Sequence, residues 1–431
     1  MSVQTPAQQR TAIVIIGILF FCFGFVTWLN GTLIPFLKLA CELDNDIQAF
    51  FVTSAFYLAY FFLALPSAKI LEKIGYKKGM ALGLFVMAIG SLVFIPAANS
   101  RSFPLFLIGL FTQGMGLALL QTASNPYISI VGPIESAAKR ISIMGICNKL
   151  AGALSPLILS AVVLKNAQAI ENNIATTTDK AAKDILLNEL TQRIIPPYII
   201  IAIALTILAF LIVKSSLPEI TNPEDTQSSG KVEKTSVFGF PHLILGVICI
   251  FFYVGVEVLA GDAIGTYGKA MGMSLDTTKY FTTLTLVAML IGYIIGVFTI
   301  PKYLSQQKAL LGSAILGILL CLVIYFTDGY VAIAGIALLG LANALMWPAL
   351  WPMAIDGLGK FTQIGSAMLV MGIVGAAIIQ PLYPALKLNF QFSNELAFFC
   401  CAFPAYIYIL YYSLSGHKAG KTTIPLALGG V

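Results

Sequence analysis

The sequence predicts an all-α integral membrane protein in which twelve transmembrane helices form two pseudo-symmetric groups of six. Long apolar stretches recur along the chain, 58% of its residues are hydrophobic, and only 10% are charged. A hydrocarbon core about 30 Å thick needs roughly 20 mostly apolar residues in a helix, and segments of that size recur along the chain. A long polar stretch after the sixth of them divides the chain into halves. A bundle of six plus six helices is typical of membrane carriers.

The expected spans are joined by short loops except at two places, the loop 165–194 and the stretch after the sixth span. They are residues 12–38, 47–70, 79–98, 103–132, 141–164, 195–215, 242–270, 277–300, 308–327, 329–355, 364–386 and 395–414. We therefore expect an N-terminal six-helix bundle at 1–213, a cytoplasmic linker at 214–241, and a C-terminal six-helix bundle with a short tail at 242–431. The first span is too long for the apolar region of a signal peptide, so we expect no cleaved leader.

Basic residues in the loops predict the orientation. With both termini inside, fifteen basic residues lie on the cytoplasmic side and nine on the other, four of these in the long loop 165–194. Short loops that carry an excess of Lys and Arg remain in the cytoplasm. We expect a multi-pass protein of the bacterial inner (plasma) membrane with both termini cytoplasmic. The net charge of +6 lies in these loops and calls for no nucleic acid.

Two segments carry a resemblance to known proteins. Residues 66–78, PSAKILEKIGYKK, are similar to the loop motif between helices two and three of the major facilitator superfamily, with Ala68 and Glu72 where that motif has Gly and Asp. Residues 121–133, QTASNPYISIVGP, followed by Arg140 and Asn148, resemble the fucose:proton symporter family, which includes glucose/galactose and N-acetylglucosamine permeases. The resemblance implies sugar symport by alternating access. It also implies a cytoplasmic gate, for which we name Glu72, Lys77 and Arg140.

The chain departs from this family where its proton chemistry is thought to lie. The resemblance aligns an Asp of the first helix with Gly31 and a Glu of the fourth with Gln121, neither of which titrates. Another group must therefore couple transport to a cation. Three ionisable residues lie well inside the expected spans: Lys149, Glu257 and Asp262. Charged residues inside a membrane are costly and usually functional.

Glu257 is our first candidate for cation coupling and Asp262 the second. On an ideal helix the five residues between them turn about 140°, so they share a face only if Gly261 and Gly265 break the helix. A carboxylate among amides and hydroxyls can ligate Na⁺ or carry a proton. The loss of both family acids favours Na⁺ over H⁺, which makes Glu257 a possible Na⁺ ligand. Lys149 is either a counter-charge for an acid or a residue that snorkels toward water.

Amides and aromatic rings are the candidates for sugar contact. The resemblance implies a cavity lined by spans one, four, seven and ten, and a sugar needs hydrogen-bonding groups and flat rings in such a cavity. We name Asn30, Gln121, Asn125, Asn148, Asn343 and Trp347. Asn343, Trp347 and Trp351 recur every fourth residue of span ten.

The expected function is a cation-coupled hexose symporter, not an enzyme, with no cofactor beyond its coupling ion and working as a monomer in the bilayer. The chain has no Walker motif, which excludes ATP hydrolysis. A facilitative hexose uniporter and an N-acetylglucosamine permease are the alternatives. A multidrug exporter would favour an apolar cavity lined by Met and Phe. A membrane sensor would need an output domain larger than the tail after Ser415.

Overall fold

The computed structural model describes residues 6–130, 137–215, 217 and 235–421. These residues contain twelve helices or helix combinations that are long and apolar enough to cross a membrane, and no strand. The first half is built from α1 (Pro6–Thr27), α2 (Asn30–Ala40), α3 (Asp46–Ile74), α4 (Tyr76–Asn99), α5 (Phe103–Ile130), α6 (Ala137–Val163), α7 (Ala167–Thr176), α8 (Lys180–Gln192) and α9 (Ile195–Lys214).

The second half begins after the polar stretch. It consists of α10 (Pro241–Asp262), α11 (Ile264–Ala270), α12 (Leu275–Thr278), α13 (Phe281–Thr299), α14 (Gln306–Phe326), α15 (Gly329–Ala344), α16 (Met346–Ile355), α17 (Thr362–Met371), α18 (Gly375–Phe390) and α19 (Asn394–Leu414), with 3₁₀ turns at Val237–Gly239, Gly359–Phe361, Gly372–Val374 and Gly416–Lys418. The predicted fold class is confirmed. Most of the predicted linker 214–241 lies outside the described residues, so its boundaries stay a prediction.

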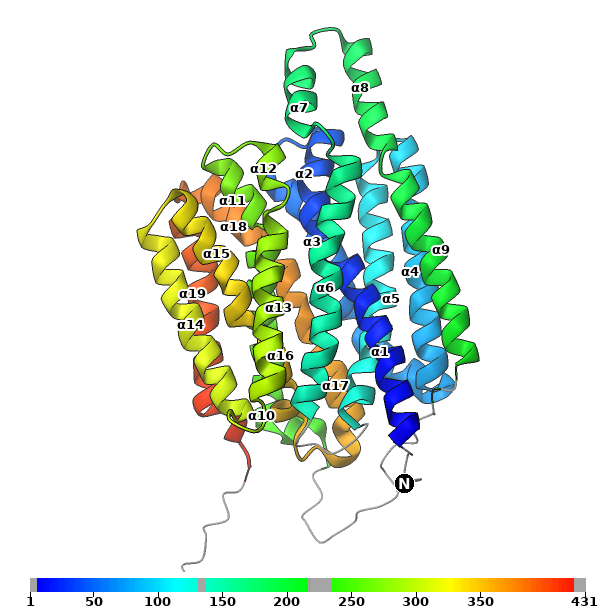
Figure 1. Cartoon of the computed structure of the whole chain (residues 1–431), viewed down its shortest axis with the longest axis vertical. Coiled ribbons are helices and arrows are strands. Elements are labelled where there is room, and N and C mark those ends of the chain that lie inside the picture. The colour runs from blue at the N-terminus through cyan, green and yellow to red at the C-terminus, as the bar shows by residue number, and fades with distance from the viewer. Residues whose placement is uncertain (1–5, 131–136, 216, 218–234, 422–431) are drawn as a thin grey trace, which may run out of the picture.

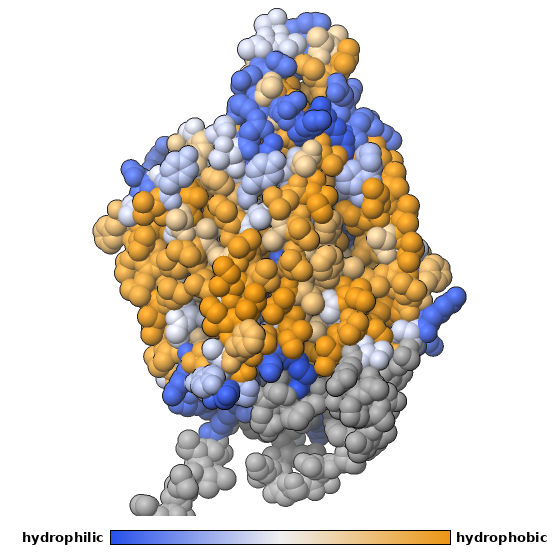
Figure 2. All heavy atoms as spheres, in the orientation of Figure 1, coloured by the Kyte–Doolittle hydropathy of each residue, from blue (hydrophilic) through white to orange (hydrophobic). Residues whose placement is uncertain are grey.

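The surface carries an apolar belt between two polar ends. Figure 2 shows hydrophobic side chains around the middle of the bundle and hydrophilic ones above and below. Large apolar residues such as Phe62, Phe210 and Phe298 are more than half exposed on this belt. Such a belt matches the hydrocarbon layer of a bilayer. The chain is a multi-pass membrane protein.

Several spans are interrupted near the middle of the bundle. The first breaks between α1 and α2, the seventh between α10 and α11 at Ala263, and the tenth between α15 and α16 at Leu345. Pro348 explains the last break, because its ring displaces the carbonyl of Ala344 from helical bonding. In the eleventh span, a Cβ atom at Gly375 would lie 1.8 Å from the Phe251 carbonyl oxygen, so α18 approaches α10 more closely than any other residue allows.

The predicted loop 165–194 is instead a helical hairpin, formed by α7 and α8, that projects from one end of the bundle (Figure 1). Asp179 caps α8 by accepting hydrogen bonds from the amides of Ala181 and Ala182. Both helices are short and largely polar, so neither has the apolar length that marks a membrane span. We call the end of the bundle that carries this hairpin the hairpin end, and the opposite end, where α1 begins, the terminal end.

Most of the hydrogen bonds between the two halves, among the described residues, lie toward the hairpin end, while α17 also packs on α3 and α5 toward the terminal end. Ser54 Oγ donates to the Ala377 carbonyl at 2.8 Å, and Lys279 Nζ donates to the Leu164 carbonyl at 3.0 Å. Toward the terminal end, Gln363 Nε2 donates to the Ala68 carbonyl at 3.3 Å. The α7–α8 hairpin adds another bond between the halves at the hairpin end, since the Gln168 amide donates to Asp276 Oδ2 at 3.3 Å. The bundle is therefore closed at the hairpin end.

Candidate substrate cavity

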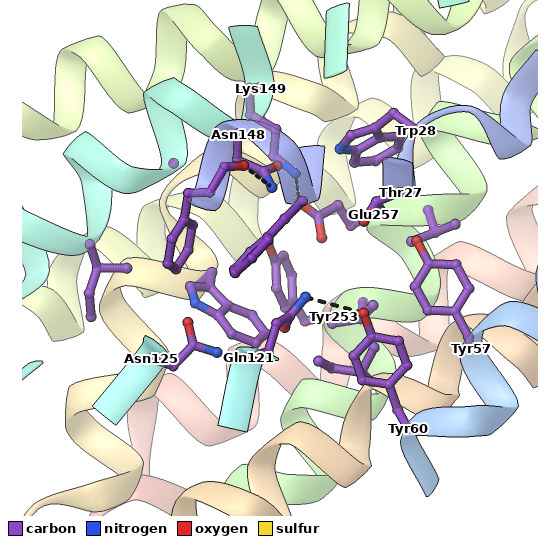
Figure 3. A pocket seen from close by; sticks show the side chains of 18 of the residues that line it. Thr27, Trp28, Tyr57, Tyr60, Gln121, Asn125, Asn148, Lys149, Tyr253 and Glu257 are labelled. Atoms are coloured by element: carbon purple, nitrogen blue, oxygen red, sulfur yellow. Dashed lines mark hydrogen bonds and ion pairs between the residues drawn. The ribbon is translucent and has the colours of Figure 1, made fainter. Parts of the chain in front are cut away.

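A cavity of about 90 Å³ lies between the halves, in the middle of the bundle (Figure 3). The first half contributes side chains from α1, α3, α5 and α6, and the second half from α10, α13, α16 and the turn Gly372–Val374. Its lining continues toward the terminal end through Ile141 and Gly145 of α6. The helix breaks described above surround this region, as they do around binding sites of many carriers.

A buried ion pair crosses the cavity from one half to the other. Lys149 Nζ of α6 lies 3.0 Å from Glu257 Oε1 of α10, and the two residues are 6% and 7% exposed. The same ammonium lies 4.5 Å from the centre of the Trp28 ring. Lys149 is thus a counter-charge across the interface of the halves and does not snorkel. Breaking such a pair leaves a buried charge without compensation, at a cost of several kcal/mol.

Three predicted amides line the cavity beside this pair. Gln121 Nε2 donates to the Tyr60 hydroxyl at 3.2 Å, and Asn148 Nδ2 donates to the Phe20 carbonyl at 3.3 Å. Asn125 lies one turn beyond Gln121 on α5 and also lines the cavity. Figure 3 shows Asn125 and Asn148 on the side away from Tyr57, while Gln121 reaches across to Tyr60, which stacks on Tyr57. The wall therefore offers hydrogen-bond donors and acceptors to a bound ligand.

Aromatic rings form the rest of the wall. Trp347 lines the cavity and stacks on Trp351, with ring centres 5.1 Å apart, while Trp351 itself is fully buried behind it. Tyr253 lies 6.3 Å from the Trp347 ring, one turn before Glu257 on α10. Flat rings beside amides and an ion pair are chemistry that suits a polar ligand with apolar faces, such as a sugar ring.

The structure does not bring every predicted residue to this cavity. Asn30 is 1% exposed and does not line the cavity, and Asn343 accepts a hydrogen bond from the Tyr406 hydroxyl at 2.8 Å. Helix breaks explain why neither asparagine lines the cavity. Asn30 follows the break after α1, and the break at Leu345 separates Asn343 from Trp347. Asp262 is also absent from the lining, because it lies on a different face of α10 from Glu257. Their roles stay predictions.

Sequence reasoning missed four tyrosines that line the cavity, Tyr57 and Tyr60 of α3, Tyr253 of α10 and Tyr293 of α13. Tyr253 lies four residues before Glu257 and so occupies the same face of a helix, a spacing that was available in the sequence. Tyr293 lies in an apolar span with nothing around it to mark it. Its position follows from packing, because its ring fills the space beside Gly145.

The predicted gate residues lie at the terminal end of the first half. Glu72 is exposed, and within the described ranges its carboxylate makes no hydrogen bond or ion pair. Lys77 Nζ donates to the Ser215 carbonyl at 2.5 Å, and Arg140 Nε donates to the Ile128 carbonyl at 3.0 Å. These contacts stay inside the first half, and the gate role of all three residues stays a prediction.

The model of the Major Facilitator Superfamily matches residues 16–384. The glucose/galactose transporter of Brucella abortus is 32% identical over 96% of this chain and 97% of that protein. The L-fucose-proton symporter of Escherichia coli is 27% identical over 87% of each. The crystal structure of the transporter FucP in its outward conformation covers 94% of this chain and 98% of that one, with a TM-score of 0.75 and 25% identity.

Proposed function

The chain belongs to the Major Facilitator Superfamily, and from that premise we propose that it is a cation-coupled hexose symporter that works by alternating access. The observation that carries the proposal is the cavity between the halves, which amides, aromatic rings and a buried ion pair line together. Glucose and galactose are our first substrates, because the relative from Brucella abortus is named for them. N-acetylglucosamine is the alternative sugar.

The sugar contacts that we propose are Gln121, Asn125, Asn148 and Trp347. Each lines the same cavity as the Lys149–Glu257 pair. Asn30 and Asn343 are retained only for another conformation, because neither lines the cavity in this one. The amides supply hydrogen bonds to hydroxyl groups, and Trp347 supplies a face for the C–H side of the ring.

Glu257 and Asp262 remain the acids that we propose for cation coupling. The sequence favoured Na⁺, but the relative from Escherichia coli is named a proton symporter, so we place H⁺ first and Na⁺ second. A facilitative uniporter is the competing function, since it would use the same cavity without a coupled ion.

The orientation that we propose puts the terminal end in the cytoplasm and the hairpin end outside. The excess of basic residues in the short loops of the terminal end supports it. The state described here, closed at the hairpin end, is then closed to the outside. Glu72, Lys77 and Arg140 fall at the cytoplasmic side in this orientation, which suits a gate. We further propose that one chain is the functional unit.

Uptake into proteoliposomes tests the function. The purified protein should accumulate labelled glucose or galactose when a proton gradient, or a Na⁺ gradient, is imposed alone. Transport that only equilibrates the sugar under both gradients would establish the uniporter instead. Failure to move either hexose or N-acetylglucosamine would contradict sugar transport altogether.

Removing the aromatic face should weaken sugar binding. Trp347→Ala should cost about 1–2 kcal/mol, by analogy with aromatic pairs, which corresponds to roughly tenfold weaker binding. Trp347→Phe should recover much of the loss, because a flat ring remains. Gln121→Ala should cost as much or more, since a buried group left without its partner loses its hydrogen bond without regaining water. Calorimetry on the purified variants measures each affinity.

Tyr330→Ala is the matched control, because this ring is 73% exposed at the hairpin end and should leave affinity unchanged. Unchanged affinity in Trp347→Ala would remove α16 from the sugar site and leave α5 and α6 to form it.

A further inference from the structure

Asp262 is the most deeply buried carboxylate of the described chain. It is 2% exposed, and neither of its oxygen atoms has a hydrogen-bond partner among the residues that the structure describes. It lies at the last position of α10, where the helix breaks before α11. The cavity described above does not include it. An ionised carboxylate buried without partners is so unfavourable that such a group takes up a proton instead.

The space around Asp262 is closely packed by helices of both halves. A Cβ atom on Gly31 of α2 would lie 3.2 Å from Asp262 Oδ1 and 2.6 Å from Thr282 Oγ1 of α13. A methyl group therefore does not fit between these three elements without a shift. Trp28 packs on the neighbouring Gly261, where a Cβ atom would lie 2.3 Å from the indole ring. Such a site has room for a proton, which needs no ligand shell.

The charges near Asp262 come from few elements. Lys149 of α6 interacts electrostatically with Asp262 as well as with Glu257, and the hydroxyl of Tyr57 on α3 also interacts with both acids. From α2 and α13, Gly31 and Thr282 bring only uncharged groups to it. Two acids thus share one ammonium. If both were ionised, the middle of the bundle would carry one excess negative charge.

The other buried cations of the described chain are engaged at the two ends. Lys279, 9% exposed, pairs with Asp276 at 2.8 Å toward the hairpin end. Arg140 lies nine residues before Lys149 on α6, about 13.5 Å along the helix toward the terminal end. One further positive charge is therefore needed beside Asp262, and a proton supplies it.

We propose that Asp262 is the proton-binding site of the carrier and that Lys149 is a counter-charge shared by its two acids. While Asp262 is protonated, Lys149 pairs with Glu257 in the cavity wall, as the structure has it. When the O–H bond of Asp262 breaks and the proton passes to water, the new carboxylate attracts the Lys149 ammonium away from Glu257. The cavity then loses the ion pair from its wall. This inference rests on the proposed sugar transport.

The shared counter-charge gives a physical reason for coupling. Sugar binds to the wall that contains the Lys149–Glu257 pair, so it binds the protonated form better than the deprotonated one. A ligand shifts an equilibrium only through such a difference in affinity. By reciprocity, bound sugar must raise proton affinity by the same factor. Symport follows from this single exchange of partners.

Two measurements test the proton site. The first compares wild type with Asp262→Asn in proteoliposomes, using D-glucose and D-galactose. The variant resembles the protonated acid, so sugar counterflow should remain measurable, affinity should no longer depend on pH, and accumulation driven by a proton gradient should fall to the equilibrium ratio. Asp44→Asn, the same change at an exposed position outside the spans, should accumulate sugar as wild type does.

The second measurement is infrared difference spectroscopy without sugar. Wild type at neutral pH should show the carbonyl band of a protonated carboxylic acid, which Asp262→Asn removes and Asp44→Asn keeps. Glu257→Gln should weaken the band, because Lys149 then has only Asp262 to pair with and favours its ionised form. This measurement decides the case even if Asp262→Asn is too unstable for transport assays, because the band in wild type and its weakening in Glu257→Gln are measured without that variant.

Three results would overturn the inference. They are accumulation by Asp262→Asn under a proton gradient, absence of the band from wild type, and a band that Glu257→Gln leaves at full strength. Accumulation by wild type under a Na⁺ gradient alone would also overturn it, while leaving hexose transport intact. A wild type that shows the band, loses it in Asp262→Asn and moves no sugar would instead contradict the proposed function and support the proton site.

Discussion

Glu257→Gln should abolish concentrative uptake and leave sugar counterflow partly intact. The glutamine amide keeps the size of the side chain but cannot hold the Lys149 ammonium, which lies 3.0 Å away in the wild type. The cation cycle then loses the acid that exchanges partners with Asp262. Counterflow exchanges sugar for sugar, so the carrier crosses the membrane with sugar bound in both directions. It therefore needs no net movement of the cation. The two assays on one batch of proteoliposomes separate these effects.

The matched control is Glu189→Gln on α8, where the acid forms an i,i+4 pair with Arg193 at 3.4 Å and is largely exposed. This variant should transport as wild type does, since exposed pairs of this kind contribute little. If Glu257→Gln lost counterflow and accumulation equally while remaining folded, Glu257 would be a sugar ligand or a structural residue, and coupling would have to lie elsewhere.

Lys149→Met should destabilise the folded protein more than any single change in the cavity wall. The variant leaves Glu257 buried without its counter-charge, and breaking a buried pair in this way costs about 3–5 kcal/mol. Lys149→Arg keeps the charge and should lose far less. Thermal unfolding in detergent, followed by size-exclusion chromatography, gives the apparent Tm of each variant.

The double variant Lys149→Met, Glu257→Gln provides the decisive comparison. Removing both charges leaves no unpaired ion in the cavity, so most of the lost apparent Tm should return, while accumulation of sugar should not. A double variant as unstable as Lys149→Met alone would show that the lysine stabilises the bundle through packing on Trp28, which its ammonium approaches at 4.5 Å.

The span pattern of this protein could be predicted from sequence because the hydrocarbon layer imposes it on every helix separately. Each span can be recognised from the length and hydrophobicity of its own stretch, whatever helices pack against it. The helices α7 and α8 were missed for the same reason, since they lie outside the bilayer and carry polar faces. Their stability comes from contacts with residues far away in the chain, such as the pair between Asp184 and Arg101 at 2.9 Å.

The cavity was predictable in part. Gln121 and Asn125 lie on one unbroken helix, so helical spacing alone placed both on one face, which lines the cavity. Asn343 and Trp347 obey the same spacing, but the break at Leu345 turns them apart. The pairing of Lys149 with Glu257 joins residues 108 positions apart. No local pattern encodes such a contact, because it depends on how the two halves dock.

The hairpin of α7 and α8 is held unequally by the two halves. Glu42 pairs with Lys183 at 2.6 Å and Arg101 with Asp184, which fix α8 to the first half. On the other side, Glu171 pairs with Lys269 of α11, and the Leu275 amide donates to Gln168 Oε1 at 3.0 Å. Opening of the hairpin end must break these contacts of Glu171 and Gln168 with the second half. The adjoining surfaces of α7 and α11 therefore form an epitope that exists only while the hairpin end is closed. An antibody fragment that bound both helices at once would hold the carrier in that closed state.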